Sequence, residues 1–99
     1  MHLLYDQKPI SIFMTNADTK IRVEFCNVKM KMRPCQFRHF HNYLNNLSKK
    51  LHSKTESVDL LLVKDSLNIQ ISLNHFLLLC RAVQSVMQKR FDLKDFYQN

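Results

Sequence analysis

Residues 21–32 of this 99-residue chain are IRVEFCNVKMKM, and residues 60–71 are LLLVKDSLNIQI. In the first stretch, apolar side chains alternate with charged ones before and after Cys26 and its neighbour, a pattern typical of two strands joined by a tight turn. A shift of 39 residues places Ile21 on Leu60 and brings the apolar positions of the two stretches into register. The sequence therefore predicts two strand-turn-strand units.

Each unit is followed by a segment with helical spacing. After both stretches the apolar residues recur every three or four positions instead of every two. Pro34 suits the first position of one helix, and Ser72 suits the cap of the other. The paired apolar positions are Ile21/Leu60, Val23/Leu62, Val28/Leu67, Met30/Ile69, Met32/Ile71, Phe37/Phe76, Phe40/Leu79, Leu44/Val83 and Leu47/Val86. We interpret residues 20–51 and 58–90 as tandem strand-strand-helix repeats within one domain, residues 1–99.

Two such repeats predict a two-layer α+β fold. We expect their hairpins to pair into one antiparallel sheet with both helices on one face, and an extra N-terminal strand at residues 10–14 to cover one edge. A chain of this length can bury roughly two thirds of its unfolded surface, which is enough for one core without disulfides.

The chain contains no glycine, although average usage near 7% predicts about seven. Phosphate-binding loops, dinucleotide fingerprints and nucleophile elbows each need backbone conformations or close approaches that a Cβ forbids. The sequence therefore excludes nucleotide-handling enzymes and hydrolases of those kinds.

The cysteines indicate a reducing compartment. Cys26, Cys35 and Cys80 are an odd number at wide spacing, which suits free thiols better than a disulfide framework. Neither a signal peptide nor a membrane-spanning run is predicted, so we expect a cytoplasmic protein with no membrane association.

Positive charge is concentrated in the first repeat. Between residues 20 and 54 there are nine Lys and Arg but a single acid, whereas residues 55–99 hold five of each. The cations that we expect on the open face of the first hairpin are Arg22, Lys29, Lys31 and Arg33. They form a candidate contact for nucleic acid or an acidic protein, the alternative being an ordinary solvent-exposed face. Only Phe13 offers an outward aromatic ring on a strand for base stacking.

The second repeat carries apolar residues beyond those that its core stripe needs. These extra positions are Leu61, Val63, Leu78 and Ala82. A second copy of the chain could cover them, which predicts a homodimer or higher homo-oligomer. The C-terminal tail is the alternative cover, through Phe91, Leu93, Phe96 and Tyr97.

Neither a metal site nor a catalytic site is predicted. Cys35 and His39 lie one helical turn apart, but His39 and His41 differ by about 200° around a helix and cannot share a metal. A thiol and a histidine could meet only through the fold, for example Cys26 or Cys80 with His75 or His41. We therefore predict no catalytic residue, no metal and no cofactor, and the sequence does not indicate an enzyme.

Residues 10–47 resemble a family of small uncharacterised proteins from Bacteroidota-type bacteria. The likeness depends on a strand, a tight turn, a strand and a helix opening on spaced aromatic residues. The positions that carry it are Asn27, Val28, Met30, Met32, Phe37 and Phe40. The function of that family is unknown, so the resemblance implies no activity and no site residues. Some members have a cysteine pair near the second strand, and residues 14–20 contain none.

Taken together, these patterns predict a fold but do not identify a function. The hypothesis that accounts for most of them is a non-enzymatic cytoplasmic interaction domain that self-associates. The alternative hypothesis is a nucleic-acid-binding protein that uses the basic face of the first hairpin.

Overall fold

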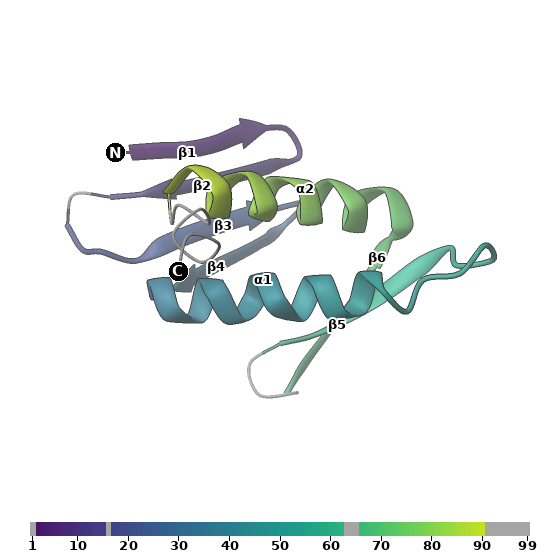
Figure 1. Ribbon diagram of the computed structural model, residues 1–99. Coiled ribbons are helices and arrows are strands. Elements are labelled where there is room, and N and C mark those ends of the chain that lie inside the picture. Colours follow the sequence, from purple (N-terminus) through teal and green to yellow (C-terminus); the bar gives the residue numbers. More distant parts are fainter. Residues whose placement is uncertain (1, 16, 63–65, 91–99) are drawn as a thin grey trace.

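The structure, a computed structural model, describes residues 2–15, 17–62 and 66–90. Six strands and two helices follow one another along this part of the chain (Figure 1). Their bounds are β1 His2–Gln7, β2 Ile10–Met14, β3 Ile21–Phe25, β4 Val28–Met32, α1 Pro34–Ser48, β5 Ser57–Leu62, β6 Leu67–Ser72 and α2 Leu73–Arg90. The predicted α+β class is confirmed.

Strands β1 to β4 form one antiparallel sheet in sequence order. The predicted N-terminal strand, β2, pairs with β3 as expected. Strand β1 was not predicted, because its segment, HLLYDQ, lacks an alternating pattern. It pairs with β2 and forms the outer edge of the sheet, so the N-terminal part contributes two strands instead of one.

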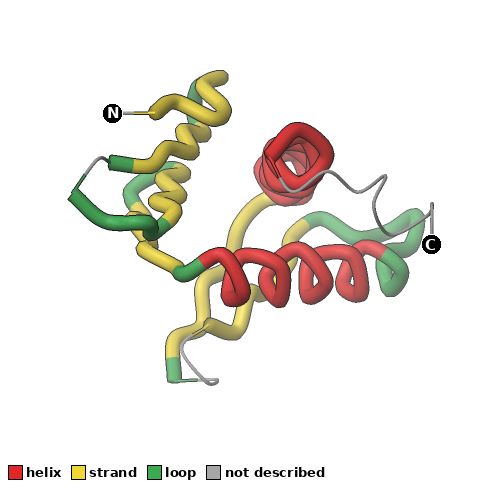
Figure 2. Tube along the Cα trace, turned by 60° about the vertical axis from the view of Figure 1, so that its left-hand side comes forward, coloured by secondary structure: helices red, strands yellow, loops and turns green. Residues whose placement is uncertain are grey.

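The second hairpin does not join this sheet, which corrects the expectation of one continuous sheet. Strands β5 and β6 pair only with each other in the described structure. In Figures 1 and 2 their hairpin extends below α1, on the side away from β1. One physical reason lies at Leu61, whose backbone N–H donates to the Tyr43 hydroxyl at 2.7 Å instead of to a neighbouring strand.

Both helices begin where the sequence predicts. Pro34 occupies the first turn of α1, and the Gln36 side chain accepts a hydrogen bond from the Arg33 N–H at 2.8 Å. At the start of α2 the Ser72 hydroxyl accepts from the His75 N–H at 3.2 Å, which is the predicted cap. The two helices cross, so that Figure 2 shows α2 end-on and α1 along its length.

A single core joins the sheet, the hairpin and the two helices. The order strand, strand, helix occurs twice, as β3-β4-α1 and β5-β6-α2, with similar burial at matching positions. Phe37 and Phe76 are both fully buried, as are Ile21 and Leu60. Whether the two units are copies of one ancestor stays a prediction. Among the described residues no strand pairs with the outer side of β4, so this edge of the sheet is open beside α1.

Candidate functional site

The open edge of β4 offers backbone hydrogen-bonding groups at two lysines. A two-residue turn at Cys26 joins β3 to β4, where Phe25 faces Val28. The pair that closes such a turn is hydrogen-bonded, and hydrogen-bonded pairs then alternate along an antiparallel ladder. The N–H and C=O groups of Lys29 and Lys31 therefore point away from β3, toward the free edge.

A groove of about 720 Å³ runs along this edge. All five residues of β4 line it, together with one stripe of α1 and the tip of the second hairpin. The lining residues outside β4 are Gln36, His39, Phe40, Tyr43, Leu61, Leu62 and Leu67. Eight of the twelve lining side chains are apolar or aromatic, two are lysines, and none of these described residues is Asp or Glu. The groove is thus apolar in lining and positive in charge.

The groove has a second strand edge on its far side. Because the Leu61 N–H is taken up by the Tyr43 hydroxyl, it points away from β6 and toward α1. The side chain of Leu61 is 44% exposed, and so is that of Leu67. Tyr43 therefore links α1, which lines the groove, to the outer edge of β5.

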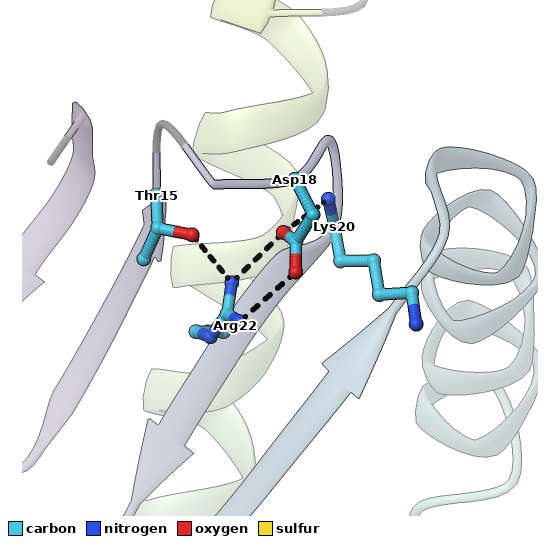
Figure 3. A network of polar contacts seen from close by, with 4 residues as sticks. All are labelled: Thr15, Asp18, Lys20 and Arg22. Atoms are coloured by element: carbon cyan, nitrogen blue, oxygen red, sulfur yellow. Dashed lines mark hydrogen bonds and ion pairs between the residues drawn. The ribbon is translucent and has the colours of Figure 1, made fainter.

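Arg22, one of the four predicted contact residues, is occupied by an ion pair (Figure 3). Its two terminal nitrogens donate to the Asp18 carboxylate at 3.1 and 3.2 Å, and one of them also donates to the Thr15 hydroxyl at 3.1 Å. The hydrogen bond from Arg22, together with one from the Lys20 backbone N–H, lowers the pKa of Asp18 from 3.8 to about 2. Arg22 thus stabilises the loop between β2 and β3.

The other three predicted cations remain at the surface. Lys29, Lys31 and Arg33 are exposed, and the two lysines line the groove. Phe13, the predicted stacking ring, is half-buried. The structure therefore brings Lys29 and Lys31 to a hollow along a strand edge, whereas Arg22, which faces Lys31 from β3, is held by Asp18.

The four residues predicted for self-association do not form one surface. Leu61 lies on β5 at the groove, whereas Leu78 lies half-buried on α2. Ala82 is fully buried within the core, so it is not available to a second copy. Val63 and the tail residues Phe91, Leu93, Phe96 and Tyr97 lie outside the described residues.

Among the cysteines and histidines, one thiol and one imidazole come together. The Cys26 Sγ lies 3.7 Å from the His75 Nδ1, joining the β3-β4 turn to the start of α2, and both groups are solvent-accessible. Within residues 2–15, 17–62 and 66–90, no three His, Cys, Asp or Glu side chains are grouped so that they could hold a metal ion. The contact between Cys26 and His75 therefore holds the β3-β4 turn of the sheet against the start of α2.

His41 and Cys80 face the interior. His41 is buried, and its Nε2 lies 2.8 Å from the Gln84 Oε1, so that it donates from α1 to α2. Burial raises the pKa of the Cys80 thiol to about 11, whereas Cys26 and Cys35 are exposed.

The opposite edge of the sheet differs from β4. The pairing of β1 with β2 shifts register between Leu3 and Tyr5. Side chains of α2, including Arg81 and Lys89, border the smaller hollow of about 440 Å³ beside β1. The irregular register at this edge opposes the addition of another strand. The regular, five-residue β4 is therefore the sheet edge better suited to binding.

Sequence reasoning missed Tyr43 and Leu67 as site residues. Tyr43 lies beside the predicted buried stripe of its helix, and its polar tip at an apolar helical position was the available signal. Leu67 matches Val28 in the predicted apolar pattern, yet it is 44% exposed.

Comparison with protein-family models, with curated proteins and with solved structures gave no match to this chain. The resemblance of residues 10–47 to uncharacterised bacterial proteins therefore stays a prediction. In the described part of the chain, neither helix combines the length and the apolar character needed to cross a bilayer.

Proposed function

We propose that the chain is a non-enzymatic protein-interaction domain that binds an extended segment of its partner at the β4 edge. The observation that carries this proposal is the groove along β4, where the outward backbone groups of Lys29 and Lys31 lie beside apolar side chains. An added strand obtains affinity from main-chain hydrogen bonds and specificity from pockets for its alternate side chains. The groove supplies both.

The size of the groove supports a strand as the occupant. A strand takes up about 3.3 Å of length per residue, roughly 4.8 Å of width and roughly 10 Å of height, or about 160 Å³ per residue. A volume of about 720 Å³ therefore accommodates four to five residues, which matches the five residues of β4.

Selection of peptides on the full chain tests the proposal. We expect a displayed library of random twelve-residue peptides to yield binders that slow hydrogen exchange at the Lys29 and Lys31 amides. The variant Lys31→Pro removes an outward N–H, a change that edge strands tolerate, whereas Lys31→Gln removes the charge and keeps the donor. Binding that survives Lys31→Pro, or binders that protect amides elsewhere, would contradict strand addition.

One source of such a strand is a second copy of the chain. Self-association is therefore part of the proposed function. Leu61 and Leu67, each 44% exposed at the hairpin tip, would gain cover from it. Sedimentation of the full chain at tens of micromolar measures this directly, and a dimer should dissociate in the Lys31→Pro variant. We also propose the cytoplasm as its location, since the free thiols of Cys26 and Cys35 are exposed.

Nucleic-acid binding is the second candidate function, favoured by the net charge of +7 and by exposed Lys29, Lys31 and Arg33. Phosphate contacts of this kind weaken steeply as salt rises. Fluorescence anisotropy of labelled single- and double-stranded oligonucleotides measures nucleic-acid binding. Binding that falls with salt and disappears in Lys29→Glu/Lys31→Glu supports this candidate, and its absence at low salt removes it.

A further inference from the structure

We infer that the partner segment of the β4 groove is an extended acidic strand in which Asp or Glu alternates with apolar residues. This inference rests on the proposed function and names the chemistry of the ligand for the same site. It follows from the two faces of β4, from the charge of the groove, and from the second strand edge opposite β4.

The two faces of β4 require different side chains from a neighbouring strand. Lys29 and Lys31 are exposed on one face, whereas Met30 and Met32 point to the other face and are half-buried and buried. Side chains of an added strand alternate in the same way and pair with those directly across. Residues opposite the lysines are therefore best acidic, and the residues between them best apolar.

The rest of the groove lining contributes no acid to offset the two lysines of β4. His39 lines it from α1, and no described lining residue is Asp or Glu. Glu24 faces Lys29, but from β3 on the side already paired, so it does not line the groove. Basic residues of a bound segment would therefore lie opposite Lys29 and Lys31 with no acid in the groove lining, and like charges directly opposite are destabilising.

The apolar residues of the partner have defined contacts. Phe40 and Tyr43 from α1 lie under the groove, and the leucines of the β5-β6 tip border it. The outer edge of β5 bounds the groove at the Leu61 N–H, which is held by the Tyr43 hydroxyl. The inserted strand thus lies between β4 and β5, in the position where the two sheets fail to meet.

Three peptides with one apolar pattern test this inference on the full chain. They carry Glu, Gln or Lys at alternate positions and Val or Leu between them, and their Kd values are measured by fluorescence anisotropy at low and near-physiological salt. We expect the Glu peptide to bind about tenfold more tightly than the Gln peptide, because each cross-strand ion pair contributes roughly 0.2–1 kcal/mol and tenfold corresponds to about 1.4 kcal/mol. The Lys peptide should bind most weakly.

Charge reversal on β4 provides the decisive variant. In Lys29→Glu/Lys31→Glu the preference should change to the Lys peptide. The matched control is Lys49→Glu/Lys50→Glu, which makes the same change of net charge at exposed residues after α1, outside the groove lining. This control should keep the preference for the Glu peptide.

The outcomes separate the inference from the proposed function. Equal binding of all three peptides, blocked by Lys31→Pro, overturns the acidic partner and leaves strand addition standing. If the control and the β4 variant weaken binding of the Glu peptide equally, the inference is overturned too, because the attraction would then depend on net charge and not on β4. If no peptide binds the chain, strand addition fails together with the inference.

Discussion

Position 22 in the first strand-strand-helix unit (β3, β4 and α1) is an arginine held in an ion pair, whereas the matching position in the second unit (β5, β6 and α2) is Leu61, 44% exposed. At the matching positions 37 and 76, by contrast, both units carry a phenylalanine, and both rings are fully buried. The two units therefore agree at these fully buried positions and differ at position 22.

The groove lies where the two units differ. Tyr43 on α1 binds the backbone of Leu61, and the residue that matches it on α2 is Ala82, which is fully buried in the core. Lys29 and Lys31 match Asn68 and Gln70, which carry no charge. A shared core thus sets the positions of the strands, and unmatched surface residues determine where a ligand could bind.

Truncating the matched phenylalanines should give the largest effect. Phe37→Ala and Phe76→Ala each remove a fully buried ring, so each should lower the free energy of unfolding by about 3–5 kcal/mol. Urea denaturation followed by circular dichroism measures both. The exposed Leu77 supplies the control, because Leu77→Ala removes a side chain that is 44% exposed and should change stability little. A loss below about 1 kcal/mol at either phenylalanine would show that the two units do not contribute equally to the core.

The next effect concerns His41 and its match, Cys80. His41→Ala leaves the Gln84 carbonyl without the donor that now lies 2.8 Å away, so it should cost about 1–3 kcal/mol. In a double-mutant cycle with Gln84→Ala, the double variant should lose about 0.5–1.5 kcal/mol less stability than the sum of the losses in the two single variants. Cys80→Ala removes no side-chain partner of this kind and should cost less. Additive losses would mean that the two helices are held together by apolar packing alone.

Thiol reactivity should also separate the two units. With a pKa of about 11, Cys80 is a thiolate in roughly one molecule in a thousand at pH 8, and it is half-buried as well. Cys26 and Cys35 are exposed, so they should react at least tenfold faster with an aromatic disulfide reagent. Absorbance gives the two phases, and peptide mapping by mass spectrometry assigns them. Early modification of Cys80 would show that the core opens around α2.

Local patterns were sufficient to predict every element except β1, but not how the elements assemble. Alternation at residues 21–32 predicted β3 and β4, and Pro34 and Ser72 predicted both helix starts. The separate hairpin was missed because pairing between sheet edges depends on distant groups, here the Tyr43 hydroxyl that takes the N–H of Leu61.

The candidate site shows the same division. Charge and the alternation of the first hairpin together selected Lys29 and Lys31, along with Arg22 and Arg33, because nine cations and a single acid lie between residues 20 and 54. The groove itself combines a strand edge, a helix stripe and a hairpin tip from three parts of the chain. Each of those residues is ordinary in its own segment, so only the fold could reveal the groove.

The smallest effect should come from the ion pair that the second unit lacks, since Ser57 and Leu61 match Asp18 and Arg22. Arg22 holds the pKa of Asp18 at about 2 in the folded chain, below its ordinary 3.8. A depressed folded pKa stabilises the fold above the unfolded value, and this contribution is lost as the pH falls from about 4 toward 2. Exposed pairs contribute little, so the change should be small.

Urea midpoints at pH 5, 4, 3 and 2 measure this contribution. Asp18→Asn removes the titrating group, so its midpoint should decline less on acidification than that of the unmodified chain, and the two proteins should converge near pH 2. Arg22→Gln removes the partner instead. Its urea midpoint should also decline less between pH 4 and pH 2 than that of the unmodified chain, although Asp18 still titrates. If all three proteins gave parallel midpoints from pH 5 to pH 2, the ion pair would contribute nothing to folding, and positions 22 and 61 would differ only in how they meet a ligand.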